Sequence, residues 1–262
     1  MCSLTWMLTP QGYEIFFNRD EQRTREAALS PQSFKVHHTQ VMMPIDPVGQ
    51  GSWIATNEFG LSVCLLNLYQ GDIPKGILIS RGQLVRALSA SRNVQQVFEA
   101  LNQLSLNQYA PFTLVIFDSE LTRHKGHVFA MEWDGHYLNS RVLEEPVFSS
   151  GVDFDNVMVY REQSYLALIG RDQNVEPQRE KHYQYHAHHH EDLAHLSPCM
   201  HRSDAKTVSF THIEVKNKVP IMKYFANSPC LMKSNVSMTA YPLLVSQMSD
   251  VDNEQTVHTY NS

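Results

Sequence analysis

Several features that mark common protein classes are missing from this sequence of 262 residues. It has no run of about 18 uninterrupted apolar residues, so no transmembrane helix is predicted. Its start lacks a basic segment followed by a long apolar one, so we expect no signal peptide and a cytoplasmic location. The net charge of −6 comes without a lysine- and arginine-rich run interleaved with aromatics, which argues against nucleic acid as a partner. A small-molecule ligand is the favoured interpretation.

Cysteine is also scarce. The four cysteines (Cys2, Cys64, Cys199 and Cys230) are widely spread and form no CxxC pair. This spacing predicts neither a disulfide framework nor a zinc site, so we expect free thiols and no metal.

What the sequence does contain is enough apolar material for a real core, at 42% hydrophobic and 10% aromatic residues. It shows no repeat and no Gly/Ser linker. One domain over residues 1–235 is therefore predicted, followed by a polar C-terminal tail over 236–262.

The first eighteen residues have the pattern of a β-hairpin. Apolar side chains alternate on both sides of a turn at Thr9-Pro10-Gln11-Gly12. If Leu8 lies opposite Tyr13, the register places Cys2 opposite Arg19 on the same buried face. Cys2 and Arg19 would then close the open end of the hairpin, flanked by Asn18 and Asp20.

Other elements follow from apolar periodicity and turn residues. A second hairpin is predicted over 53–56 and 61–67, and a helical pair over 84–88 and 94–104. Strands are predicted over 112–118, over 127–143 with an Asp134-Gly135 turn, and over 207–215. The polar stretch 174–195 fits a helix or a mobile loop.

Removal of Met1 would give Cys2 both a thiol and a free α-amino group. An α-amine has a pKa of about 8, so it can accept the proton of the thiol without a histidine. Arg19 would favour the thiolate, and Asp20 could orient the ammonium or a substrate amide. The alternative is that Cys2 is a small buried side chain and that Arg19 and Asp20 belong to a solvated charge run. Their conjunction across the hairpin favours the catalytic interpretation.

The segment "MCSLTW…GYEIFFNRDEQRTR" resembles the signature of the Asn-Arg-Asp-Glu (NRDE) family, which includes the transport-and-Golgi-organization proteins. More distantly it resembles the choloylglycine hydrolase and penicillin V acylase group of N-terminal nucleophile (Ntn) hydrolases. "NEFGLSVCLLNLY" supports the same placement, and the NRDE resemblance extends through "SPCMHRSDAKTVSFTHI". The resemblance, with the element order, implies an α+β fold, the four-layer α-β-β-α sandwich of Ntn hydrolases.

Carried over to this sequence, the resemblance makes Cys2 the nucleophile, with Arg19 and Asp20 as positioning groups. It makes Asn67 a donor to the oxyanion. The acylases supply a further asparagine from a Thr-Asn-Ser-Pro-like stretch, but the counterpart here is "VFSSGVD", with Ser149 and Ser150. Loss of such a donor costs about 3 to 4 kcal/mol unless a serine or a backbone amide replaces it.

Three further residues are assigned to substrate binding: Asn18, Ser150 and Arg202. Arg202 would meet a carboxylate or phosphate of the substrate, an assignment that depends mostly on the family resemblance. The alternative for Arg202 is a surface ion pair with Asp204, which contributes little.

The segment "EKHYQYHAHHHEDLAHLSPCMHR" holds seven of the fourteen histidines. In a helix, His182, His186 and either His189 or His190 would share one face at metal-ligand spacing. No HExxH pattern is present, and we favour a solvated segment or a weak adventitious metal site.

Two functions remain. The first is an Ntn-type amidohydrolase that cleaves a non-peptide C–N bond of an acyl amide through Cys2 and needs no cofactor. The alternative is a non-catalytic protein that binds and traffics haem or an acyl-CoA-like lipid on the same scaffold.

Overall fold

The computed structural model describes residues 2–170, 179–232 and 238–243. These residues form two antiparallel sheets, of six and seven strands. The six-stranded sheet has, in spatial order, β10 (Val147–Ser149), β1 (Cys2–Thr9), β2 (Gly12–Gln22), β11 (Ala205–Lys216), β12 (Val219–Phe225) and β13 (Thr239–Pro242). The seven-stranded sheet has β3 (Leu29–Val36), β4 (Thr39–Ile45), β5 (Ile54–Asn57), β6 (Ser62–Asn67), β7 (Phe112–Phe117), β8 (Val128–Trp133) and β9 (Leu138–Leu143).

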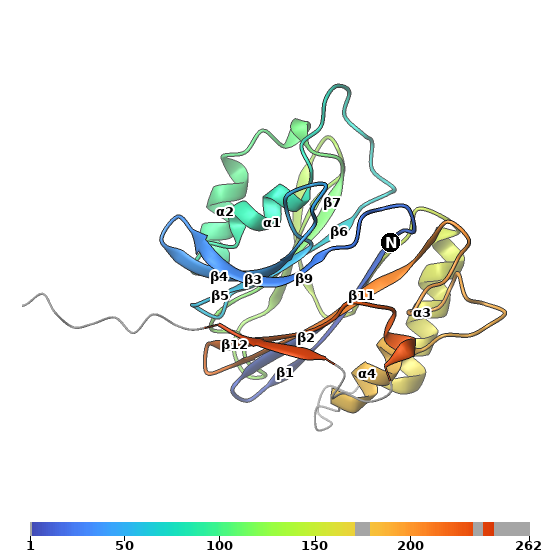
Figure 1. Cartoon of the computed structure of the whole chain (residues 1–262). Helices are drawn as coiled ribbons and strands as arrows, with labels where there is room; N and C mark the ends of the chain where they lie inside the picture. The colour runs from blue at the N-terminus through green and yellow to red at the C-terminus, as the bar shows by residue number, and fades with distance from the viewer. Residues whose placement is uncertain (1, 171–178, 233–237, 244–262) are drawn as a thin grey trace, which may run out of the picture.

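Helices cover the outer faces of the two sheets. They are α1 (Gly82–Leu88), α2 (Val94–Asn102), α3 (Phe154–Leu168) and α4 (Arg179–Ala187), with short 3-10 turns η1 (Leu106–Gln108) and η2 (Pro229–Leu231). The α1/α2 pair packs on the seven-stranded sheet, and α3 and α4 lie on the far side against the six-stranded sheet (Figure 1). The predicted four-layer α-β-β-α sandwich is therefore confirmed.

The main core lies between the two sheets. From the six-stranded sheet it receives Leu4, Ile15 and Phe17, and from the seven-stranded sheet Val115 and Phe117, all with no exposed surface. Because side chains alternate across a strand, the alternating apolar residues of β1 and β2 all reach this layer. Each side chain of this size contributes about 1.5–3 kcal/mol when buried.

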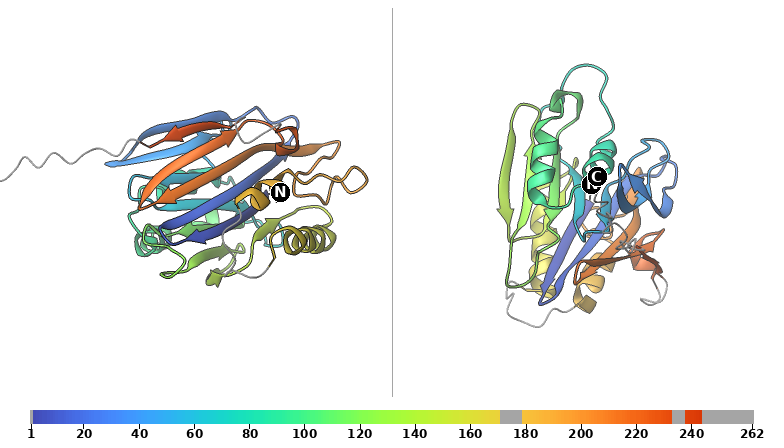
Figure 2. Two further views of the ribbon diagram at one scale, coloured as in Figure 1. Left: turned by 90° about the horizontal axis from the view of Figure 1, so that it is seen from below. Right: turned by 90° about the vertical axis from the view of Figure 1, so that its left-hand side faces the viewer.

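The β1–β2 hairpin has the predicted register. Leu8 pairs with Tyr13 and Cys2 pairs with Arg19. The pairing continues to Thr9 and Gly12, so the connection is the two residues Pro10 and Gln11. β1 is not an edge strand, because β10 pairs with its other side. In this sheet, strands from the start and from the end of the chain run side by side (Figure 2).

The second predicted hairpin (β5–β6), both helices of the predicted pair (α1 and α2), and strands β7, β8, β9 and β11 are also present. Asn57 fixes the second hairpin to the end of α1. Its Nδ2 donates to the carbonyls of Ser89 (2.9 Å) and Ser91 (2.6 Å), and its Oδ1 accepts from the amides of Phe59 and Leu61.

The structure contains elements that the sequence-based prediction did not include. These are helix α3 and strands β3, β4, β10 and β12. Within the stretch 174–195, α4 covers Arg179–Ala187, whereas 174–178 lies outside the described residues. Strand β13 falls in the predicted tail but pairs with β12, and Leu243 after it is buried, so the boundary drawn at residue 235 cuts off an edge strand. Residues 244–262 of that tail lie outside the described residues.

No helix within the described residues combines the length and the apolar character that crossing a bilayer requires.

Candidate active site

Cys2 lines a cavity of about 640 Å³ at one end of the sandwich. The walls come from the ends of β1 and β2, the β6 end and the segment 78–82. Arg19, Trp53, Asn67 and Arg81 are among the other lining residues. Residues predicted from the sequence to act together, Cys2, Arg19, Asp20 and Asn67, therefore border one cavity.

Cys2 is the first described residue of β1 and is held on both sides. It pairs with Arg19 of β2 and with Ser149 of β10. Directly opposed residues of antiparallel strands point to the same face, so these three side chains form a row across the sheet. Burial raises the pKa of the Cys2 thiol, while the Asp20 backbone amide, which hydrogen-bonds the sulfur, and the Arg19 guanidinium act in the opposite direction. The sulfur is therefore protonated at neutral pH unless a base acts on it.

Arg19 is held in place by contacts of its own. Its guanidinium carbon lies 4.3 Å from the centroid of the Trp53 ring, a cation–π geometry, and its Nη2 lies 3.1 Å from Glu21 Oε2. Asp46 lies 4.0 Å from the same nitrogen and accepts a 2.5 Å hydrogen bond from Arg25. Burial would raise the pKa of Asp46, but Arg25 holds it below its usual value. The charges of this wall are therefore neutralised in pairs.

Asp20 points toward the helical layer behind β2. Its Oδ1 accepts a 2.6 Å hydrogen bond from the Thr207 hydroxyl, and its Oδ2 accepts one of 3.3 Å from Arg161. Burial raises the pKa of Asp20, and the Arg161 charge opposes that rise. Asp20 also borders a neighbouring cavity of about 310 Å³, together with Asn67 and Arg202.

Arg161 is a residue of this region that the sequence analysis missed. It comes from α3, its side chain has no exposed surface, and it donates to the Cys2 carbonyl (3.3 Å) and the Ser3 hydroxyl (2.8 Å). Further donations go to the carbonyls of Leu196 (3.2 Å) and Ser197 (3.1 Å). One guanidinium therefore ties the start of β1, Asp20 and the 196–197 loop together. No motif in the sequence marks it.

The two serines of "VFSSGVD" have different surroundings. The Ser149 Oγ is buried and has no hydrogen-bond partner among the described residues. The Ser150 Oγ donates to the carbonyl of Val152 (2.5 Å) and accepts from its amide (3.2 Å). Ser149, rather than Ser150, lies directly across from Cys2.

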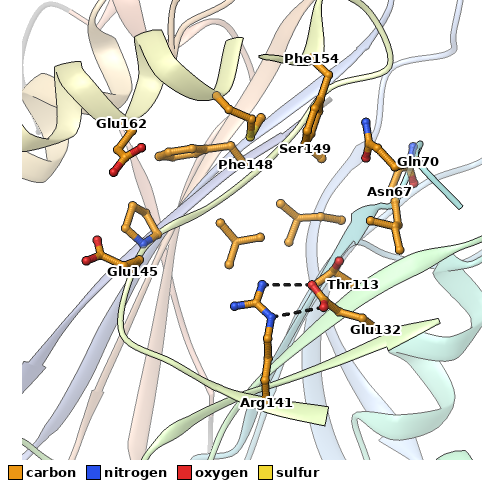
Figure 3. Close-up of a pocket in the computed structure, with 15 residues that line it drawn as sticks. Asn67, Gln70, Thr113, Glu132, Arg141, Glu145, Phe148, Ser149, Phe154 and Glu162 are labelled. Carbon is orange, nitrogen blue, oxygen red and sulfur yellow. Dashed lines mark hydrogen bonds and ion pairs between the residues drawn. The ribbon is translucent and has the colours of Figure 1, made fainter. Parts of the chain in front are cut away.

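Asn67 lies at the end of β6 and donates from Nδ2 to the Tyr69 hydroxyl at 2.9 Å. Figure 3 shows Asn67 and Ser149 together in the wall of a further cavity, of about 360 Å³, beside Phe154 of α3. This cavity also contains the ion pair between Arg141 and Glu132, 3.0 Å apart. Asn67 borders all three cavities, so it lies where they approach one another.

Two predicted substrate-binding residues have other partners. The Asn18 side chain faces the helical layer, where its Nδ2 donates to the carbonyls of His186 and Pro198, both at 2.9 Å. Asn18 is not among the residues that line the Cys2 cavity. Arg202 borders the 310 Å³ cavity and forms a two-point ion pair with Asp204, as the alternative interpretation had it.

The favoured interpretation treated the histidine-rich segment as solvated, but part of it is buried. His182 and His186 are buried, and the Thr5 hydroxyl hydrogen-bonds His182 Nδ1 (2.8 Å) and His186 Nε2 (2.9 Å). The His182 ring stacks on Phe16 with centroids 4.5 Å apart. Burial lowers the pKa of His182 to about 3 and also lowers that of His186, so both imidazoles are neutral.

Metal-ligand geometry occurs elsewhere. Among the described residues, the potential ligand atoms of Cys199, His201 and Cys230 lie within 4.8 Å of one another. All four cysteines are free thiols, as predicted.

A model of the family described as Transport and Golgi organisation 2 matches residues 1–150, more than half of the chain. The chain belongs to the Transport and Golgi organisation 2 family. The matched region includes Cys2, Arg19, Asp20, Asn67 and Ser149. No curated protein sequence matches the chain.

Solved structures place the chain in the Ntn-hydrolase fold. The C2A mutant of conjugated bile acid hydrolase from Clostridium perfringens aligns with a TM-score of 0.56 at 14% identity, over 100% of this chain and 97% of that one. A Caenorhabditis elegans ortholog of N-acylethanolamine-hydrolyzing acid amidase aligns with a TM-score of 0.53 at 10% identity, over 93% and 100%. Penicillin V acylase from Agrobacterium tumefaciens aligns with a TM-score of 0.51 at 11% identity, over 86% and 83%. At such identities the likeness concerns the fold alone.

Proposed function

We propose that this protein is an Ntn-type amidohydrolase that cleaves the C–N bond of a non-peptide acyl amide, with Cys2 as nucleophile after removal of Met1. The observation that carries the proposal is the position of Cys2. Its thiol lines a 640 Å³ cavity while its strand is held between β2 and β10. A nucleophile fixed in this way is already positioned for attack, which lowers the entropic part of the barrier. Met1 itself lies outside the described residues.

The raised pKa of the buried Cys2 thiol makes a base necessary. The α-amine of Cys2 is the proposed base, because its pKa of about 8 allows it to be neutral in part at physiological pH. It takes the thiol proton as sulfur bonds to the acyl carbon. It then returns that proton to the leaving amine as the C–N bond breaks. A water molecule, deprotonated by the same amine, hydrolyses the thioester and releases the acid.

The tetrahedral intermediate requires donors for its oxyanion. Asn67 is the proposed first donor, since its amide lies in the cavity wall at the end of β6. Ser149 is the proposed second donor: its Oγ has no hydrogen-bond partner among the described residues, and it lies across from Cys2. Ser150 is less suited to this role because its hydroxyl already closes a turn with Val152.

Three groups are proposed to position the nucleophile. Arg19 stabilises the thiolate of Cys2, and Arg161 fixes both the Cys2 carbonyl and Asp20. Asp20 would orient the α-ammonium. None of the three exchanges a proton with substrate in this scheme.

The decisive experiment is the intact mass of untagged protein before and after incubation with N-acyl amides and activated acyl esters. We expect Met1 to be absent and one acyl group to appear on Cys2. Cys2→Ala should never show that adduct, while Cys64→Ala, which removes a thiol from the inter-sheet core, should keep it. Retention of Met1, or acylation that survives Cys2→Ala, would refute the proposal.

The oxyanion assignment is tested by the acylation rate. Asn67→Ala and Ser149→Ala should each slow the reaction by about 10²–10³-fold, whereas Ser150→Ala should affect stability more than rate. Equal rates for Ser149→Ala and the wild type would exclude Ser149 as a donor.

The second candidate is a non-catalytic protein for haem or an acyl-CoA-like lipid. It is favoured by one observation, which is that the "VFSSGVD" stretch offers serine hydroxyls where the acylases that this sequence resembles have an asparagine amide. Titration with haem and with a long-chain acyl-CoA tests it. Reversible 1:1 binding that persists in Cys2→Ala, without any covalent adduct, would favour the carrier over the hydrolase.

A further inference from the structure

A second cluster of reactive side chains lies behind β11, outside the Cys2 cavity. Cys199 and His201 belong to the segment between α4 and β11, and Cys230 belongs to η2 after β12. His201 Nε2 lies 3.7 Å from Cys199 Sγ and 3.4 Å from Cys230 Sγ. The three ligand atoms are all within 4.8 Å of one another.

These separations match the edges of a tetrahedral metal site. With Zn–S bonds of about 2.3 Å and a Zn–N bond of about 2.1 Å, tetrahedral geometry places S and N about 3.6 Å apart. Two thiolates and one imidazole form a donor set that binds Zn²⁺ in preference to Ca²⁺ or Mg²⁺. We propose that Cys199, His201 and Cys230 bind one Zn²⁺ ion, with a fourth position left for water or another exogenous ligand.

The backbone holds the three residues in place without a metal. The Cys199 amide donates to the His188 carbonyl at 3.0 Å, and the His201 amide donates to the Ala194 carbonyl at 2.9 Å. On the other side, the Ser228 hydroxyl donates to the Thr207 carbonyl at 2.6 Å and fixes the start of η2. Binding therefore requires little ordering of the chain, which favours affinity.

A cation can reach the cluster from solvent. Binding of Zn²⁺ displaces the two thiol protons into solvent. Cys230 and His201 are partly exposed, whereas Cys199 is buried, so an ion can enter from the Cys230 side. The His189 ring packs on His201 with centroids 4.5 Å apart and restrains it.

Thr207 connects this site to the candidate active site. Its backbone amide donates to the Met200 carbonyl (2.8 Å), and its hydroxyl accepts from the Met200 amide (2.8 Å), which holds the residue between Cys199 and His201. The same hydroxyl donates to Asp20 at 2.6 Å. Bound zinc would thus stiffen the support of Asp20, although the zinc site does not depend on the proposed hydrolysis.

The test uses the full-length protein, kept reduced and stripped with a chelator. Zn²⁺ alone is titrated in competition with a chromogenic chelator, and Co²⁺ is added as a spectroscopic probe. We expect one ion per chain, and for Co²⁺ a thiolate-to-metal charge-transfer band with the intense visible bands of a tetrahedral site. Cys230→Ser and His201→Gln should weaken Zn²⁺ binding by about 100-fold or more, since each removes one of three protein ligands.

Two matched controls separate this site from adventitious binding. Cys64→Ala removes a thiol from the inter-sheet core, and His190→Gln removes an exposed histidine of the same segment. Both should bind Zn²⁺ like the wild type. Binding lost in His190→Gln but kept in Cys230→Ser would overturn the proposal, as would a Co²⁺ spectrum without a thiolate band. That spectrum is recorded on the wild type, so it decides the matter even if a variant fails to fold.

Discussion

The two helical layers of this protein are attached to their sheets by different physical means. The α1/α2 layer packs on the seven-stranded sheet through aliphatic side chains such as Leu84, Val85 and Leu101, all fully buried. The α3/α4 layer packs on the six-stranded sheet through polar side chains, of which Arg161 and His186 have no exposed surface. One layer depends on the hydrophobic effect, whereas the other combines directional bonds with the aromatic packing of Tyr183 on Phe16 and Phe210.

Part of the polar layer forms a chain of hydrogen bonds and ion pairs. Arg179 binds both carboxylate oxygens of Glu14 (2.6 and 2.5 Å), Glu14 bonds His212 (2.8 Å), and His212 bonds Tyr183 (2.8 Å). A buried network whose groups are paired specifies one geometry, because any displacement leaves a polar group unsatisfied. This network lies directly behind β1 and β2, the strands that carry Cys2, Arg19 and Asp20. The difference suggests that the polar layer sets the geometry of the candidate site, whereas the apolar layer supplies stability.

The largest effect should come from the centre of the polar layer. Arg161→Met removes the partner of the buried Asp20 and should lower the free energy of unfolding by about 3–5 kcal/mol. Urea unfolding measures it. The control is Arg141→Met, which breaks an exposed ion pair and should cost about 0–1 kcal/mol. Equal losses in the two variants would contradict the assigned role of Arg161.

In the apolar layer, Leu101→Ala should cost about 2–5 kcal/mol, because it leaves a cavity under α2. The loss should be the same at pH 5 and pH 8, because Leu101 belongs to the hydrophobic cluster and neither leucine nor alanine titrates. Val142→Ala, at a position 44% exposed, should change stability by about 0.5 kcal/mol or less. A pH-dependent loss in Leu101→Ala would show that the two layers are energetically coupled.

Thr5→Val keeps the shape of the side chain but removes the hydroxyl that bonds His182 and His186. We expect a loss of about 1–3 kcal/mol, the cost of leaving buried polar groups without a partner. Ser119→Ala removes an exposed hydroxyl and serves as the control. Thermal and urea unfolding should agree, and an unchanged midpoint for Thr5→Val would mean that the imidazoles find other partners.

The smallest expected effect, counted per pH unit, is the change of the free energy of unfolding with pH. His182, with its pKa lowered to about 3, and His186, whose pKa is also lowered, stay neutral in the folded state, whereas in the unfolded chain both titrate near 6.5. As pH falls below about 6.5 the unfolded state takes up protons first, so stability should fall by up to about 1.4 kcal/mol per pH unit for each histidine.

Glu14 adds a further loss of stability at lower pH. Burial would raise its pKa, but His212 and Arg179 lower it to about 2, so its stabilising contribution disappears as pH falls from about 4.5 toward 2. Unfolding free energies measured from pH 8 to pH 4 check the histidine part. His182→Phe, which can still stack on Phe16, should flatten the curve; an unchanged slope would contradict the assignment.

The register of the first hairpin was predictable because apolar residues alternate in both β1 and β2 around a short turn. With Leu8 opposite Tyr13, that pattern brings Cys2 next to Arg19. Helix α3 was not predictable in the same way. Its buried residues are Val157 and Arg161, one apolar and one charged, so no apolar stripe marks the helix. The Arg161 contacts with Cys2 and Asp20 connect segments more than 140 residues apart and leave no local signal.

The prediction for the histidine-rich segment was wrong for a related reason. The buried face of α4 consists of His182, Tyr183, Tyr185 and His186, residues that a polarity pattern assigns to solvent. The facing Thr5 and Phe16 make the burial of the histidines favourable. His212 and the Arg161 carbonyl do the same for the tyrosine hydroxyls. Likewise, Cys230 comes close to Cys199 and His201 only after β11 and β12 have reversed the chain, so spacing along the sequence does not reveal the cluster.

The strand order also has a consequence for how the chain folds. The seven-stranded sheet follows the sequence from β3 to β9, so its contacts are nearly all between neighbours and it can form once residue 143 has been synthesised. In the six-stranded sheet, β2 pairs with β11, whose residues lie about 190 positions later, and β1 waits for β10. Because long-range pairing slows folding, we expect the seven-stranded sheet to form first and the strand with Cys2 to be enclosed last. Cys2 would then acquire its surroundings only at the end of folding.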